Sequence, residues 1–133
     1  MEFLQENWIS LALGLLVLVV LFRGQVMQWL SGVQSVDPAK AVDLVNHHDA
    51  VVVDVREDSE WKQGHVRGAK HIPLGQVGQR AQELPQGPLV VMCRSGNRSA
   101  TAAVRLKKAG FEPVYNLSGG IMAWRNAGLP LEQ

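Results

Sequence analysis

The sequence predicts an α/β domain with an open, mostly parallel sheet and helices on both faces, preceded by one transmembrane helix. Two short apolar runs, residues 50–55 and 89–92, are typical of strands buried on both faces of a parallel sheet. Helix-forming segments alternate with these runs over short connections, which favours an open α/β arrangement. An uncharged run at residues 7–22 predicts the transmembrane helix.

The N-terminal run NWISLALGLLVLVVLF has sixteen residues without a charge, and its last polar side chain is Ser10. As a helix it is about 24 Å long, short of the roughly 30 Å of a hydrocarbon core. The flank up to residue 30 supplies the rest, and Trp8 and Trp29 are 21 residues apart, which suits one indole at each interface. A cleaved signal peptide is the alternative, but the start of the chain is acidic and no small-residue cleavage motif follows. We therefore expect a retained membrane anchor.

We expect four regions in the chain: an N-terminal tail at 1–6, the transmembrane helix with its interfacial flank at 7–30, a linker at 31–36 and one domain at 37–133. Acidic residues precede the apolar run, and Arg23 and Lys40 follow it. The positive-inside rule then predicts a single-pass protein of the cell (inner) membrane, with its N-terminus outside and its domain in the cytoplasm. Ser10 and Gly14 form a small-xxx-small pair, which predicts a weak homodimer.

Composition excludes several classes of function. The net charge is +1 and no basic run occurs, so nothing indicates a nucleic-acid partner. A single cysteine excludes an internal disulfide, a two-cysteine redox pair and a multi-thiolate zinc site. His47 and His48 are adjacent but lack further ligands at metal-site spacing, so we expect neither a metal nor a cofactor.

The elements of the domain follow from local signals along the chain. Asp37 can cap a first helix and Pro38 suits its first position. Glycines at 64, 110 and 128 predict three helix ends. The expected order is a helix from 38, a strand at 50–55, a helix at 57–63, a strand at 69–73, a helix at 77–84, a strand at 89–92, a helix at 99–109, a strand at 113–117 and a helix at 119–128.

The only cysteine, Cys93, directly follows the apolar run at 89–92. Ligands bind beyond the carboxyl ends of strands in such sheets, and both Asp54 and Cys93 stand at such an end. A strand, a glycine-containing turn and a helix start make a ring of backbone N–H groups that stabilises an anion. If that anion is the cysteine sulfur, the reactive thiolate is populated near neutral pH. A lone cysteine is often a buried small hydrophobe, but the nearby Arg94 and Arg98 favour a reactive thiol.

The segment CRSGNRS at 93–99 resembles the active-site loop of the rhodanese family of sulfurtransferases. DVREDSEWKQGHVRGAKHIP at 54–73 and NLSGGIMAWRNAGLP at 116–130 resemble two further blocks of the same family, with Val66 in place of an isoleucine. The resemblance covers roughly residues 36–133, and the three blocks occur in the family's order. The chain resembles those members of the family that consist of a single domain with an N-terminal membrane anchor.

The resemblance implies a role for each matching residue. Cys93 would take a sulfane sulfur from a donor such as thiosulfate, become a persulfide, and pass the sulfur to cyanide or a thiol, which could belong to a protein. Arg98 would face anionic donors, and Asp54 and Arg56 would brace the loop. Glu60 matches a position that looks structural. The loop residues that would bind substrate are Arg94, Ser95, Gly96, Asn97, Arg98 and Ser99.

Two alternatives remain beside the sulfurtransferase. Related folds with a C-x5-R loop grip phosphate or arsenate, whereas Cys93 and Arg98 form the shorter C-x4-R, whose smaller ring suits sulfur. The second alternative is a rhodanese-like module that binds a protein partner at the membrane, with Cys93 idle or regulatory. The retained cysteine and loop arginines favour the enzyme.

Overall fold

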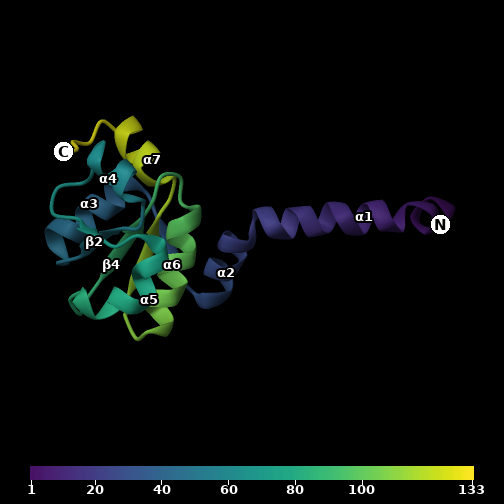
Figure 1. Cartoon of the computed structure of the whole chain (residues 1–133), viewed down its shortest axis with the longest axis horizontal. Helices are drawn as coiled ribbons and strands as arrows, with labels where there is room; N and C mark the ends of the chain where they lie inside the picture. The colour runs from purple at the N-terminus through teal and green to yellow at the C-terminus, as the bar shows by residue number, and fades with distance from the viewer.

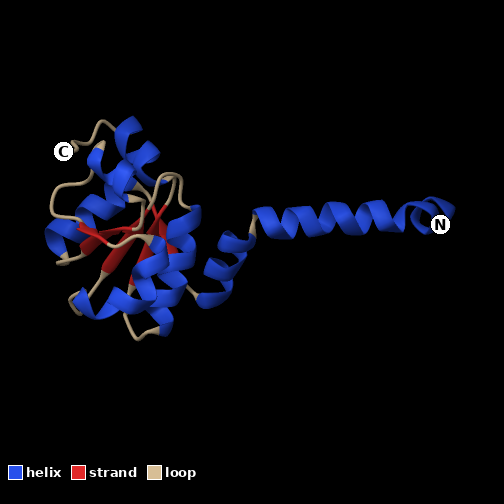
Figure 2. Ribbon diagram, in the orientation of Figure 1, coloured by secondary structure: helices blue, strands red, loops and turns tan.

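The computed structural model covers residues 1–133 and contains a five-stranded sheet in the order β1-β5-β4-β2-β3. Every strand pairs in parallel with its neighbours, and Figure 2 shows the strands enclosed by helices. The predicted α/β fold is confirmed, including the interior positions of β2 and β4. The strands are β1 (Gln34–Val36), β2 (Val51–Asp54), β3 (Lys70–His71), β4 (Leu89–Met92) and β5 (Val114–Leu117).

Two apolar clusters, one on each face of the sheet, attach the helices. Val53, Val55 and Val91 pack against α6 and α5 on one face, while Val52, Val90 and Met92 pack against α3 and α7 on the other. Alternate residues of one strand therefore serve opposite clusters, as the pleat requires. The helices are α3 (Pro38–His47), α4 (Asp58–Lys62), α5 (Val77–Arg80), α6 (Asn97–Lys108) and α7 (Gly120–Asn126), with single turns at Leu74–Gln76 and Ala81–Glu83.

Several predicted helix boundaries are close to the observed ones. Asp37 caps α3, since its carboxylate accepts a hydrogen bond of 2.8 Å from the Lys40 N–H. The helix expected at 99–109 begins two residues earlier, at Asn97, because Gly96 adopts the left-handed conformation that ends the loop. Asn97 and Arg98 therefore belong to the first turn of α6 rather than to a loop.

The N-terminal segment forms two helices. α1 (Glu2–Leu21) contains no buried residue and projects from the domain, as Figure 1 shows. The chain turns at Phe22 into α2 (Arg23–Ser31), which packs against α6. Gly24 lies against the Asn97 carbonyl at the contact, where an added Cβ would be 3.2 Å from that oxygen.

The region expected to continue the membrane span is therefore corrected in part. One straight helix does not connect Trp8 and Trp29, because α2 buries Gln28 in the domain, where this amide finds hydrogen-bond partners that lipid lacks. The linker expected at 31–36 is wrong for its last three residues, which form β1 and pair with β5. α1 itself is long and apolar enough to cross a bilayer, a property that signal sequences share.

Candidate active site

Cys93 lies at the carboxyl end of β4, where its side chain is 1% exposed. Its Sγ accepts a hydrogen bond from the Gly96 N–H at 3.1 Å, and Ser99 Oγ lies 3.3 Å away. Donors aimed at a sulfur in a buried site stabilise its anion. Of the backbone ring that the sequence predicted, the N–H of Gly96 is the group in hydrogen-bond contact with the sulfur.

Gly96 shapes the turn that makes this contact. Its φ of 107° lies in a region that residues with a Cβ rarely adopt, and it precedes the first turn of α6. Within this turn the Gly96 N–H faces Sγ. The glycine in the loop is therefore a requirement of the sulfur site.

The start of α7 holds the Cys93 loop from the other side. The Ile121 N–H donates to the Cys93 carbonyl at 2.8 Å, and the Met122 N–H donates to the Arg94 carbonyl at 3.2 Å. Gly120 lies so close that an added Cβ would be 2.3 Å from the Cys93 carbonyl oxygen. The paired glycines of the third sequence block thus allow two backbone segments to touch.

Asp54 and Arg56 form a buried ion pair at the end of β2. Arg56 Nη2 is 2.8 Å from Asp54 Oδ2, and Arg56 also donates to the carbonyls of Gly64 at 2.7 Å and Glu60 at 3.2 Å. The pair orders α4 and the turn that follows it. The resemblance implied that these two residues brace the Cys93 loop, and the contacts of the pair run to α4, whose Glu60 binds Arg98.

The guanidinium of Arg98 joins α6 to α4. Its two terminal nitrogens bind the two carboxylate oxygens of Glu60 at 2.7 and 2.9 Å, the forked geometry that suits these two groups. The hydrogen bond from Arg98 is the main reason that the pKa of Glu60 falls from 4.5 to about 2, and it raises the pKa of Arg98 in return. We expected Arg98 to face an anionic donor, but in the structure it is already paired.

Two arginines beside the Cys93 loop have no carboxylate partner. Arg94 of the loop and Arg125 of α7 are exposed and line a hollow of about 180 Å³ beside the Cys93 loop. Arg56 and Glu60 also line it, but each is neutralised by its own partner. The hollow therefore carries net positive charge that suits a small anion. Sequence reasoning singled out Arg94 and missed Arg125, whose signal was its place in the third block.

The remaining loop residues meet α2 and β5. Ser95 is exposed, while Asn97 accepts a hydrogen bond from Gln25 of α2. Ser99 is fully buried and hydrogen-bonds to Asn116 of β5, which in turn binds Gln28 of α2. Sequence reasoning missed Gln28 and Asn116, because neither lies near Cys93 along the chain.

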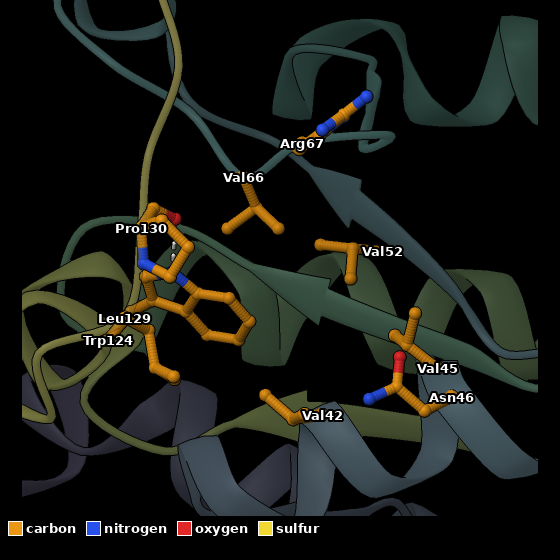
Figure 3. A pocket seen from close by; sticks show the side chains of 9 residues that line it. All are labelled: Val42, Val45, Asn46, Val52, Val66, Arg67, Trp124, Leu129 and Pro130. Carbon is orange, nitrogen blue, oxygen red and sulfur yellow. Dashed lines mark hydrogen bonds between the residues drawn. The ribbon is translucent and has the colours of Figure 1, made fainter.

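A mostly apolar hollow lies away from the sulfur. It has a volume of about 240 Å³ on the α3 and α7 side of the sheet, whereas the Cys93 side chain belongs to the cluster on the α6 side. Figure 3 shows Val42, Val52, Val66 and Trp124 directed toward one another, with the guanidinium of Arg67 turned away. With no nucleophile or acid–base pair in its wall, this hollow is not the chemical site.

The rhodanese-like domain family matches this chain over residues 37–127. The chain belongs to the rhodanese-like family. Among its relatives, the Bacillus subtilis (strain 168) protein YrkF is 43% identical over 74 residues, which make up 55% of this chain and 40% of that protein. This rhodanese-like chain thus spans less than half the length of that relative. The thiosulfate sulfurtransferase GlpE of Pseudomonas putida is 36% identical over 98 residues, 72% of this chain and 88% of that one.

A solved structure supports the same fold. The rhodanese-related protein from Thermoplasma volcanium superposes with a TM-score of 0.69 and 28% identity, covering 74% of this chain and 97% of that one. The rhodanese-like chain is thus similar in sequence to a thiosulfate sulfurtransferase and in fold to a rhodanese-related protein.

Proposed function

We propose that the protein is a membrane-anchored sulfurtransferase that moves a sulfane sulfur through a Cys93 persulfide. The observation that carries this proposal is the environment of Sγ, which is buried and faces the Gly96 N–H and the Ser99 hydroxyl. A thiolate that is already stabilised needs no general base. The relationship to a thiosulfate sulfurtransferase supports the same chemistry.

The proposed sulfur transfer has two steps, each a nucleophilic attack on a sulfur atom. The Cys93 thiolate attacks the outer sulfur of thiosulfate, the S–S bond breaks, and sulfite leaves with the bonding electrons. The persulfide that remains carries the negative charge on its terminal sulfur. Cyanide or an acceptor thiolate then attacks that sulfur, and Sγ leaves as the thiolate. One cysteine is enough because donor and acceptor visit in turn.

The anionic donor would enter through the hollow that Arg94 and Arg125 line. Both cations are unpaired, in contrast to Arg98, so they can bind the sulfonate end of a donor. We propose these two residues for donor binding, beside the loop from Arg94 to Ser99 and with Asp54 and Arg56 as indirect supports.

The anchor would place this chemistry at the cytoplasmic face of the cell membrane. α1 has the length and composition of a span, and the basic Arg23 follows it. Ser10 and Gly14 are both exposed on α1, so that a second α1 could pack against them in a weak homodimer.

Thiosulfate labelled in its outer sulfur tests the function. After incubation and rapid denaturation without reductant, we expect mass spectrometry to find one labelled sulfur on the peptide that contains Cys93. Cys93→Ser is the matched control and should take up none. Hydrolysis of an aryl phosphate by the purified protein would instead support the phosphatase chemistry of a C-x5-R loop. A Cys93→Ala protein that works normally in cells would support the partner-binding module.

A further inference from the structure

We propose that Asn116 is a positioning residue that sets the direction of the Ser99 hydroxyl group and thereby the reactivity of the Cys93 sulfur, with Gln28 of α2 as its anchor. The proposal rests on the proposed function, because it concerns the same sulfur. Its evidence is a continuous chain of hydrogen bonds that runs from α2 through β5 to the active-site loop.

The chain of hydrogen bonds consists of buried polar groups. Ser99 Oγ lies 2.6 Å from Asn116 Oδ1 and 3.3 Å from Cys93 Sγ. Asn116 Nδ2 lies 2.8 Å from Gln28 Oε1 and 3.1 Å from the Gly96 carbonyl oxygen. Gln28, Ser99 and Asn116 are 9%, 0% and 4% exposed, so these side chains are largely shielded from bulk solvent.

Backbone carbonyls fix the orientation of both amides. The Gly96 carbonyl can only accept, so the Asn116 atom that faces it must be the NH₂ group, and the oxygen must face Ser99. The same reasoning applies to Gln28, whose NH₂ group faces the Val33 carbonyl at 3.4 Å and the Ser35 hydroxyl at 2.5 Å. The oxygen of Gln28 is then directed to Asn116. The carbonyls of Gly96 and Val33 therefore imply the same direction of hydrogen-bond donation, from Ser99 to Asn116 at one end and from Asn116 to Gln28 at the other.

Ser99 has one proton for two acceptors. With Asn116 presenting an oxygen at 2.6 Å, the hydroxyl proton is directed to Asn116, and a lone pair of Oγ faces Sγ. That lone pair can accept the proton of a Cys93 thiol. To stabilise the thiolate, the hydroxyl must turn and give up its bond to Asn116. Asn116 therefore competes with the sulfur for the Ser99 proton.

The competition matches the two states of the proposed reaction. When the persulfide forms, Sγ changes from an anion to a neutral bridging atom, and the Ser99 proton returns to Asn116. When the outer sulfur passes to the acceptor, Sγ leaves as an anion, and the proton turns back to it. The Asn116 side-chain oxygen is thus a second acceptor for the Ser99 proton, and the hydrogen bond to Gln28 keeps the Asn116 amide in this orientation.

The pH profile of alkylation tests this role without any sulfur transfer. Cys93 is the only cysteine, so iodoacetamide reports on its sulfur alone. The full-length protein in detergent is used, because α2 supplies Gln28. The charged residues on the elements around the loop include Arg23 of α2, Arg56 after β2, Glu60 of α4, Arg94 of the loop, Arg98 of α6 and Arg125 of α7, and none is changed in the variants. We expect Ser99→Ala to move the midpoint of the profile up by about 0.5 to 1 pH unit, because one hydrogen bond to the thiolate is lost. This shift is about a threefold to tenfold change in the proton concentration at the midpoint.

Asn116→Leu is expected to move the midpoint down by a similar amount, because it frees the Ser99 proton for the sulfur. In the Ser99→Ala background the same substitution should have no further effect. An unchanged profile in folded Asn116→Leu, or an equal shift in both backgrounds, overturns the proposal, since the effect would then be absent or due to packing. If Asn116→Leu does not fold, Gln28→Leu decides in the same way, with a smaller downward shift that must also vanish in Ser99→Ala.

The result separates this inference from the proposed function. Persulfide formation by the wild type, together with unchanged profiles in the variants, overturns the role of Asn116 alone. Shifted profiles in a protein that never forms a persulfide support that role and leave the sulfurtransferase without its intermediate.

Discussion

Gly120 occupies a position at which any side chain would collide with the active-site loop. A Cβ there would be 2.3 Å from the Cys93 carbonyl oxygen, and the φ of 56° is left-handed. We expect Gly120→Ala to destabilise the fold by about 2 to 4 kcal/mol, from overpacking and backbone strain. Chemical denaturation measures the loss. Gly78→Ala is the matched control, since nothing lies within 4 Å of its added Cβ and its φ is unstrained, so stability should be unchanged or slightly higher.

The two unpaired arginines beside the loop also act as single residues. In a protein that carries both Arg94→Ala and Arg125→Ala, the KM for thiosulfate should rise about tenfold, because each cation offers charge-assisted hydrogen bonds to this sulfur donor. The kcat should change much less, since the Gly96 N–H and the Ser99 hydroxyl both remain beside Sγ. Steady-state assays with cyanide as the acceptor measure both constants. Arg67→Ala is the control, because Arg67 is exposed beside the distant apolar hollow. An unchanged KM in the double variant would contradict this donor site.

At the scale of elements, α4 and α6 are joined by the ion pair between Glu60 and Arg98. The pKa of Glu60 falls from 4.5 to about 2 in the folded protein, so folding favours the charged carboxylate. The resulting stability is fully present above about pH 4.5 and is lost as the pH falls toward 2. We expect Glu60→Gln to lose about 1 kcal/mol at pH 7, since solvent screens the partly exposed pair.

The loss from Glu60→Gln should shrink as the pH is lowered from 5 to 3, because protonation then weakens the wild type as well. Urea unfolding at pH 7, 5, 4 and 3 measures this trend. Glu83→Gln is the control, since its partner Arg80 lies on the surface and the loss should be small at every pH. A difference between Glu60→Gln and the wild type that stays constant with pH would contradict the assignment.

Local patterns were enough to predict the elements that position Cys93. The apolar runs VVVD and LVVM form interior strands, and Cys93 follows one of them as expected. β1 was missed because two of its three residues are exposed, so no apolar run marks an edge strand. Partners far apart in sequence were missed for a different reason. Glu60 and Arg98 are separated by 38 residues, and Gln28 and Asn116 by 88, and no local signal pairs polar residues across such distances.

At the scale of the whole molecule, no residue of α1 is buried in the domain. Leu13 and Leu16 near its middle are 58% and 57% exposed, which suits lipid better than water. An arginine near the centre of a span costs about 2.5 to 3.5 kcal/mol. We therefore expect Leu13→Arg/Leu16→Arg to move the protein from the membrane to the soluble fraction. Phe3→Arg/Leu4→Arg should stay in the membrane, because arginines near a helix end can reach the interface.

Orientation and retention of α1 can be measured on the same protein. In a Cys93→Ser background, we expect the variant Gln5→Cys to react with an impermeant maleimide in intact cells, and Gln82→Cys to react only after lysis. This result follows if the basic flank at Arg23 keeps the domain in the cytoplasm. The mass of the membrane-extracted protein should include α1. A mass that lacks α1 would identify a cleaved signal sequence, which the same apolar helix could also provide. Labelling of Gln82→Cys in intact cells would place the sulfur chemistry outside the cytoplasm.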